Sequence, residues 1–172
     1  MLKDQIVCAM FAVITAICAQ ISIPFFQVPF TMQVFAIVLS AVILGYKKAF
    51  ISQIIYILLG AIGLPVFAGF KGGIQALLGP TGGYITSFLL MVLIIGYFSE
   101  KYNDNYFIIS FSGTLGIIIC YIIGTAQLAF ILNITFSGAL KIGVLPFVIF
   151  DLAKIFLGIF LGINIKKRIY II

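Results

Sequence analysis

Apolar residues in this chain gather into long runs, which short polar stretches and proline- or glycine-rich stretches separate. The runs are continuous rather than alternating, and several approach the roughly 20 residues that a membrane-crossing helix needs. We therefore predict six helical spans, at about residues 6–23, 34–45, 49–63, 84–98, 106–132 and 144–165. With short loops between them, these spans account for the 172 residues as a single membrane domain, residues 1–172.

Two connecting regions are too irregular to be plain helix ends. Residues 24–33 contain two prolines, and a proline inside a helix removes a hydrogen bond and clashes with the preceding turn. Residues 60–83 contain eight of the chain's 17 glycines and two further prolines. Such backbone persists at membrane depth only where protein buries it or where it lines a wet cavity, and in transporters it points to the binding site. We expect residues 60–83 to fold inward as a re-entrant segment.

Composition fits an integral membrane protein and excludes several functions. Hydrophobic residues make up 64% of the chain and charged residues only 8%, with a mean hydropathy of +1.33. Soluble domains have about 25% charged residues. Because the chain has no histidine, neither a Ser-His-Asp triad nor a typical zinc site can form, and we expect no metal or cofactor. No phosphate-binding loop motif is present, so any ATP hydrolysis would come from another protein.

The distribution of basic residues predicts the orientation. With six spans, both termini and the second and fourth loops lie on one side. That side carries seven basic residues, Lys3, Lys47, Lys48, Lys101, Lys166, Lys167 and Arg168. The other side carries two, Lys71 and Lys141. Because cytoplasmic loops are enriched in lysine and arginine, we expect both termini in the cytoplasm of a multi-pass cell-membrane protein. The basic residues form no patch interleaved with aromatics, so we expect no nucleic acid partner.

The last apolar run contains an acid and a base, Asp151 and Lys154, three residues apart. At that spacing the two side chains share one face of a helix. A charge within a membrane span costs about 2.5–3.5 kcal/mol, so charged residues there usually face a cavity or a partner. One interpretation is an internal ion pair that neutralises itself. The other is a ligand site that offers one acceptor and one donor to a polar small molecule.

On the predicted topology, Asp151 lies less than two turns inside the outer end of its span. Three outward elements could converge at that depth in a pocket with aromatic walls and few polar groups, the usual composition of a small-molecule site. Besides the acid and the base, the residues expected there are Thr31, Gln33, Phe67 and Tyr84. For the three polar residues of this set, a helix-cap, turn or interface role is an equal alternative. Lys71, in an outer loop, is expected to be solvated.

Four segments carry a resemblance to a known family. They are Pro29–Gln33 (PFTMQ), Leu59–Ala68 (LGAIGLPVFA), Gly79–Tyr84 (GPTGGY) and Pro146–Lys154 (PFVIFDLAK). In order and spacing they resemble BioY, the biotin-binding membrane subunit, or S component, of energy-coupling-factor (ECF) transporters. The resemblance covers nearly the whole chain. It implies an all-α integral membrane protein with six transmembrane helices, irregular Gly/Pro-rich outer loops and a biotin pocket open to the outside.

The resemblance also implies roles for particular residues and partners. Asp151 and Lys154 match ligand-contacting positions of the family. The first span carries Ala12 and Ala16, which let another helix approach closely, either within the protein or from a separate subunit. In the family, this helix meets a transmembrane coupling protein, which works with two cytoplasmic ATPase subunits. The chain itself is then not an enzyme.

Other interpretations of the same residues stay open at this point. One is an S component for a different vitamin, and another is an ion-coupled secondary carrier in which Asp151 and Lys154 relay protons. An intramembrane enzyme is less favoured, because such enzymes usually need histidine or metal-binding carboxylates and this chain has only four acids.

Overall fold

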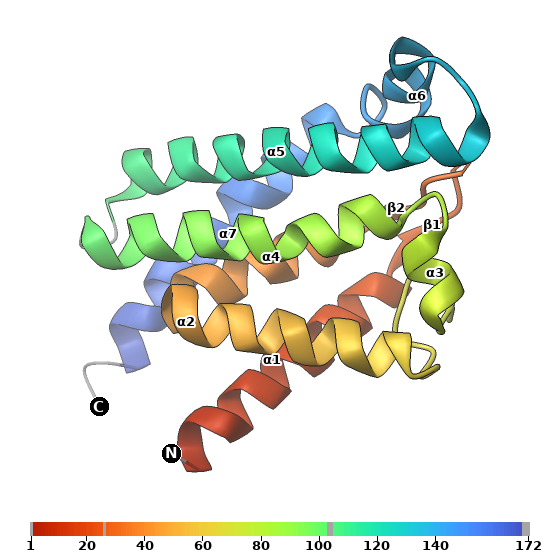
Figure 1. Cartoon of the computed structure of the whole chain (residues 1–172). Coiled ribbons are helices and arrows are strands. Elements are labelled where there is room, and N and C mark those ends of the chain that lie inside the picture. The colour runs from red at the N-terminus through yellow and green to blue at the C-terminus, as the bar shows by residue number, and fades with distance from the viewer. Residues whose placement is uncertain (1, 26, 103–104, 170–172) are drawn as a thin grey trace.

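The computed structural model describes residues 2–25, 27–102 and 105–169. Long helices lie side by side as a bundle, and the shorter elements gather at one end of it (Figure 1). In chain order the elements are α1 (Leu2–Gln20), β1 (Ser22–Ile23), β2 (Phe30–Thr31), α2 (Gln33–Ala61), α3 (Ile74–Leu78), α4 (Gly82–Lys101), α5 (Tyr106–Leu132), α6 (Phe136–Gly143) and α7 (Val148–Ile169).

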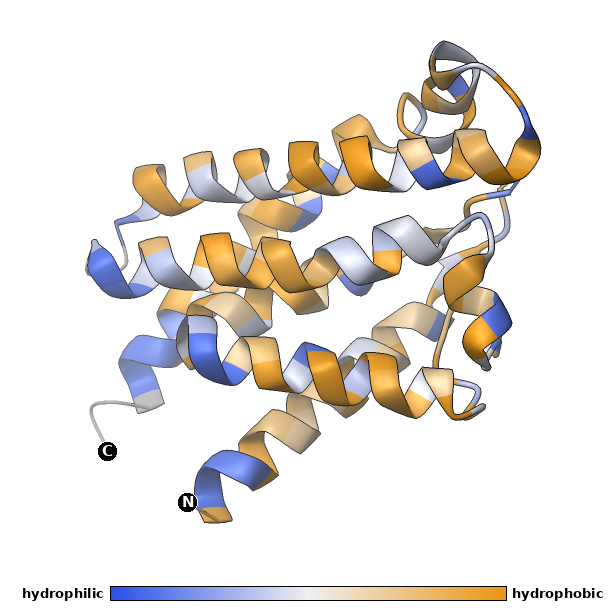
Figure 2. Cartoon of the chain, viewed as in Figure 1, coloured by the Kyte–Doolittle hydropathy of each residue, from blue (hydrophilic) through white to orange (hydrophobic). Residues whose placement is uncertain are grey.

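The surface of the bundle is apolar, as expected for a protein surrounded by lipid. Among the described residues, five helices are long and apolar enough to cross a membrane: α1, α2, α4, α5 and α7. Hydrophobic residues follow these helices, and hydrophilic residues concentrate at their ends (Figure 2). Large side chains such as Phe130 and Ile149 are about four-fifths exposed. The chain is therefore a multi-pass membrane protein.

Helix α2 is two helices that fold back on each other at Gly45. This glycine has φ 74° and ψ 174°. No helix contains this backbone conformation, and essentially only glycine adopts it. The side-chain nitrogen of Gln33 (Nε2) donates to the Tyr56 hydroxyl at 2.7 Å, although a straight helix would separate these two residues by about 35 Å. The two halves, residues 33–44 and 46–61, therefore run antiparallel, as the orange and yellow ribbons show (Figure 1).

Helix α4 packs most extensively against α2 and α5, and α7 packs against α2 and α5. Glycines allow the closest approaches. A side-chain carbon on Gly96 would lie 2.5 Å from the Tyr46 backbone nitrogen, and one on Gly124 would overlap the Tyr84 ring. Small residues at such crossings let membrane helices gain van der Waals contact.

Several sequence-based boundaries need correction. The prediction of six spans is not confirmed as a count, because the described residues hold seven helices, five of them long and apolar. The first predicted span extended to residue 23, but α1 ends at Gln20 and Ser22–Ile23 pairs antiparallel with Phe30–Thr31. The Met32 amide donates to the carbonyls of Cys18 in α1 and of Ile21 just after it, and Pro24 disfavours helix at the residue before it.

Two outer segments also differ from their predictions. The stretch 133–143, predicted as a connector, contains α6, and α7 begins at Val148 rather than at residue 144. Pro146 lies just before α7, where a residue without an amide hydrogen costs the helix nothing. The glycine-rich region 60–83 includes the last residues of α2, the five-residue helix α3 and the first residues of α4, and the remaining residues 62–73 and 79–81 are irregular as predicted.

Candidate functional site

A buried ion pair lies at the start of α7. The Lys154 ammonium is 2.8 Å from Oδ1 of Asp151, and the two residues are only 6% and 7% exposed. Their i, i+3 spacing brings both side chains to one face of the helix, as the sequence predicts. Two opposite charges so close together cost far less to bury than either charge alone.

Two other elements complete the coordination of this pair. Tyr121 of α5 donates its hydroxyl to Oδ2 of Asp151 at 2.7 Å. The Lys154 ammonium donates to the Thr31 carbonyl of β2 at 2.6 Å, and it lies 3.6 Å from the centroid of the Phe30 ring. Phe30 thus provides a cation–π contact at short range. The pair therefore joins α7 to α5 and to the β1–β2 hairpin.

A series of hydrogen bonds between side chains continues from the hairpin into the protein. The Thr31 hydroxyl donates to the Gln33 side-chain oxygen at 2.9 Å, and the Gln33 amide nitrogen donates to the Tyr56 hydroxyl at 2.7 Å. All three residues are buried. Because each of these buried polar groups has a partner, the two hydrogen bonds fix the side chains of Thr31 and Gln33 in one arrangement.

The irregular region supplies an aromatic wall. The Phe67 ring is buried and meets the Tyr56 ring edge-to-face, with centroids 5.5 Å apart. It fits because Gly60 has no side chain: an added carbon there would lie 2.0 Å from the ring. Gln20 of α1 donates to the Phe67 carbonyl at 3.1 Å and accepts from the Phe70 amide at 2.9 Å. These contacts hold the 67–71 turn against the bundle.

These parts surround a cavity of about 80 Å³. All six residues predicted to bind substrate line it: Thr31, Gln33, Phe67, Tyr84, Asp151 and Lys154. Most of the other lining residues, among them Phe30, Phe88, Ile117 and Phe147, are apolar, and Lys71, Thr81 and Tyr121 add polar groups. The structure thus brings together residues up to 123 positions apart in a space with apolar walls and a few fixed polar groups. That they bind a ligand stays a prediction.

Tyr84 contributes its ring to the cavity but has other partners for its hydroxyl. The hydroxyl donates to the Gly143 carbonyl at 3.2 Å and lies 3.5 Å from the Thr125 hydroxyl. Its ring packs on Gly124. Tyr84 therefore ties α4 to α5 and to the end of α6, and contact of this residue with a ligand stays a prediction.

The alanines predicted to meet a partner are not on an open face. Ala12 is 1% exposed and packs in the core, while Ala16 is half-buried. The burial of Ala12 fits packing within the protein, one of the two roles that the sequence left open, and contact of this helix with a separate subunit stays a prediction. The outward face carries a shallow apolar groove lined by Ile6, Ala9, Met10, Val13 and Ile14.

Comparison with known proteins identifies the family. A family model described as the BioY family matches residues 1–170. The chain belongs to the BioY family. It is 41% identical to the "Biotin transporter BioY" of Thermotoga maritima over 166 residues, covering 96% of this chain and 97% of that protein. It is 39% identical to the "Biotin transporter BioY2" of Lactococcus lactis over 164 residues, covering 94% and 88%.

A solved structure agrees with this assignment. The crystal structure of "the S-component for biotin from an ECF-type ABC transporter" superimposes with a TM-score of 0.88 at 30% identity, covering 96% of this chain and 92% of that one. This BioY chain therefore has the S-component fold. As a member of a transporter family it is not an enzyme, which removes the intramembrane enzyme from the alternatives.

Sequence reasoning missed several residues of the BioY site. Tyr121 carries no sequence signal, because a tyrosine within an apolar run is common and its partner lies 30 residues away. Gln20 lies inside the first predicted span, residues 6–23, and received no role, although it holds the 67–71 turn that carries part of the cavity wall. Phe30 was quoted within a motif but received no role, although it covers the Lys154 ammonium. Lys71 is exposed, as the sequence analysis expects, but its place in the lining of the cavity was missed.

Proposed function

We propose that this chain is the biotin-binding S component of an ECF-type transporter. The observation that carries the proposal is the Asp151–Lys154 pair with Tyr121, set in the wall of an apolar cavity. Biotin has a cyclic urea with two N–H donors and one acceptor, an apolar thiophane ring and a carboxylate. A buried carboxylate can accept from N–H donors, and the aromatic walls suit the ring. Relatives named biotin transporters support the same ligand.

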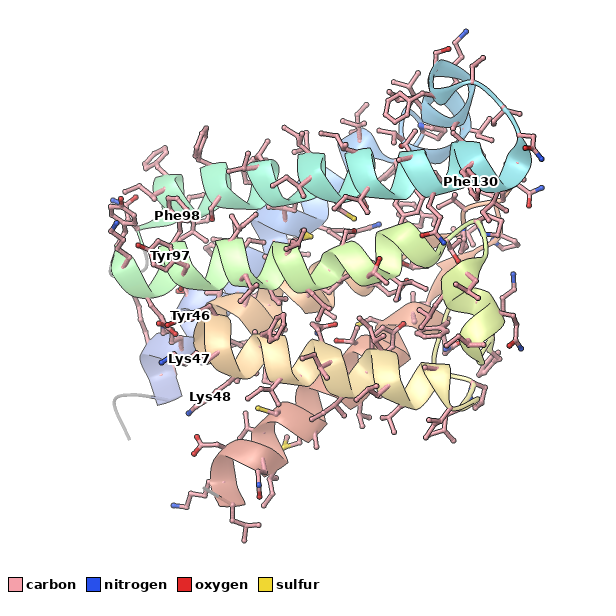
Figure 3. All side chains as sticks on the ribbon, viewed as in Figure 1. Tyr46, Lys47, Lys48, Tyr97, Phe98 and Phe130 are labelled. Atoms are coloured by element: carbon pink, nitrogen blue, oxygen red, sulfur yellow. The ribbon has the colours of Figure 1, made fainter. Side chains whose placement is uncertain are left out.

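The proposal includes six membrane crossings within one domain, with both termini cytoplasmic. If the two halves of α2 are counted separately, the number of spanning helices rises from five to six. Lys47 and Lys48 lie at the end of the bundle that also carries Tyr97 and Phe98 (Figure 3). Lys48 pairs with Asp4 near the start of α1, and the C-terminal end of α7 lies toward the same end of the bundle (Figure 1). The basic end is then cytoplasmic, and the cavity end faces outward.

The coupling partners are a transmembrane coupling protein and two cytoplasmic ATPase subunits. We expect α1 to contact the coupling protein through its outward groove at Ile6, Ala9, Met10, Val13 and Ile14. Ala9 leaves room there for another helix backbone, the same role that the sequence predicts for Ala12 and Ala16.

In the proposed mechanism, biotin enters from outside and the hairpin closes over it. Residues 28–31 line the cavity, and the Thr31 carbonyl is held by Lys154, so the hairpin is linked directly to the charged pair. ATP hydrolysis in the partner subunits then reorients the loaded chain, which releases biotin inside. Binding alone needs neither ATP nor a cofactor.

A binding measurement on the purified, reconstituted chain tests the proposal. Biotin should bind with a dissociation constant between nanomolar and micromolar, and Asp151→Asn and Lys154→Met should each weaken binding. If both variants bind biotin as tightly as the unaltered chain does, the assignment of the binding site to Asp151 and Lys154 is wrong. Labelled biotin should resist competition by other vitamins. Displacement by another vitamin at lower concentration would instead indicate an S component for that vitamin.

A further inference from the structure

Three charged side chains line the cavity, Asp151, Lys154 and Lys71. The first two neutralise each other at 2.8 Å. Among the described residues, no carboxylate pairs with the Lys71 ammonium, and this side chain is exposed at the rim. The cavity therefore carries a net positive charge, and that charge belongs to Lys71.

Lys154 is poorly placed to receive a ligand carboxylate. Its ammonium has three hydrogens, and it already contacts the Asp151 carboxylate, the Thr31 carbonyl and the Phe30 ring. An incoming carboxylate would have to displace the hairpin carbonyl, and it would then lie beside the negative charge of Asp151. In a cavity of low dielectric constant, that repulsion is strong.

The position of Lys71 is fixed by its backbone. Phe67 and Lys71 exchange two backbone hydrogen bonds, of 2.9 and 3.2 Å, in an antiparallel bridge. Residues opposite each other in such a pair direct their side chains to the same face. Phe67 faces the cavity, so Lys71 shares that face. The intervening turn is tight, with Gly69 and Phe70 both at positive φ, and Gln20 clamps it to α1.

We propose that Lys71 binds the carboxylate end of the ligand at the cavity mouth. The cyclic urea end then lies against Asp151 and Tyr121. This inference rests on the proposed function and adds the direction in which biotin enters: urea first, with the carboxylate following at the rim.

Comparing biotin with its methyl ester, which lacks the negative charge, tests the inference. Lys71→Met should weaken biotin binding about tenfold, the loss expected for one charge-assisted hydrogen bond, and should leave ester binding unchanged. Lys71→Arg should restore the preference for biotin. Retained ester binding also shows that the variant is folded. Lys141→Met, which removes an exposed lysine of α6 outside the cavity, should change neither ligand.

Ionic strength gives a second measurement on the unaltered chain. The preference for biotin over its ester should shrink in 1 M salt, because an ion pair at the mouth is screened. Equal weakening of both ligands by Lys71→Met would overturn the inference, as would no weakening of either. Loss of the preference in Lys154→Met instead of Lys71→Met would assign the carboxylate to Lys154. Failure of the unaltered chain to bind biotin would overturn the proposed function itself.

Discussion

At the scale of single residues, the site is a small network whose members depend on one another. Asp151 accepts from Lys154 with one oxygen and from Tyr121 with the other. Removing one charge leaves its partner buried without compensation, which typically costs 3–5 kcal/mol, whereas removing both often costs little. The contribution of the pair to the stability of the chain can therefore be measured separately from ligand binding.

A double-mutant cycle should reveal this signature. We expect Asp151→Asn and Lys154→Met each to lower the thermal stability of the purified chain in detergent, by an amount corresponding to about 3–5 kcal/mol. The double variant should lose less than the two single losses added together. Lys141→Met is the control for loss of an exposed lysine. Strict additivity would mean that the two charges do not stabilise each other.

The sequence identified the residues whose chemistry is conspicuous in lipid. Asp151 and Lys154 stand out because charges are rare in apolar runs. Tyr121 and Phe30 do not stand out, because aromatic residues are frequent throughout the chain, and only the fold shows which of them meets the pair.

At the scale of elements, glycines determine where helices turn and where side chains fit. Gly45 allows α2 to fold back, and an added side-chain carbon would overlap the Glu100 carboxylate. The sequence predicted a break near this position from the polar residues that follow it. It missed the hairpin, because strands of two residues are too short to show an alternating pattern.

Gly45→Ala should destabilise the chain by about 1–3 kcal/mol from backbone strain, and further through the clash with Glu100. Gly69→Ala is the matched control, because Gly69 has a similar φ of 70° but no neighbouring atom within 4 Å of an added carbon. Thermal unfolding of both variants separates strain from overlap. An equal loss in the two variants would show that the contact with Glu100 is unimportant.

Gly60→Ala should weaken biotin binding about tenfold or more, because the new methyl group forces the Phe67 ring away from its place in the cavity wall. Equilibrium binding of labelled biotin measures the loss. Gly138→Ala in α6 is the control, since an added carbon there would make its one tight contact, 3.2 Å, with the hydroxyl of Thr135, an exposed residue outside the cavity. Unchanged affinity in Gly60→Ala would mean that Phe67 does not shape the site.

At the scale of the whole molecule, the chain separates a basic end from an end built of irregular backbone. Long apolar runs were sufficient to predict a helical membrane protein. The number of crossings was harder to predict, because a 12-residue half-helix is shorter than an ordinary span and depends on its neighbours for stability.

Cysteine labelling tests the orientation. With Cys8, Cys18 and Cys120 replaced by serine, a cysteine at position 141 should react with a membrane-impermeant maleimide added to intact cells. A cysteine at position 47 should react only after the membrane is opened. The reverse pattern would place the cavity on the cytoplasmic side and contradict the proposed direction of uptake.

The first half of α2, residues 33–44, is only about 18 Å long, against about 30 Å for the hydrocarbon core of a bilayer. If the Gly45 end of this half-helix lies at the cytoplasmic surface, the β1–β2 hairpin, which joins its other end directly, would lie below the outer level of the lipid headgroups, and the mouth of the cavity with it. Such hydrophobic mismatch is relieved when the bilayer thins locally. Uptake should consequently be faster in membranes of short-chain lipids than in membranes of long-chain lipids.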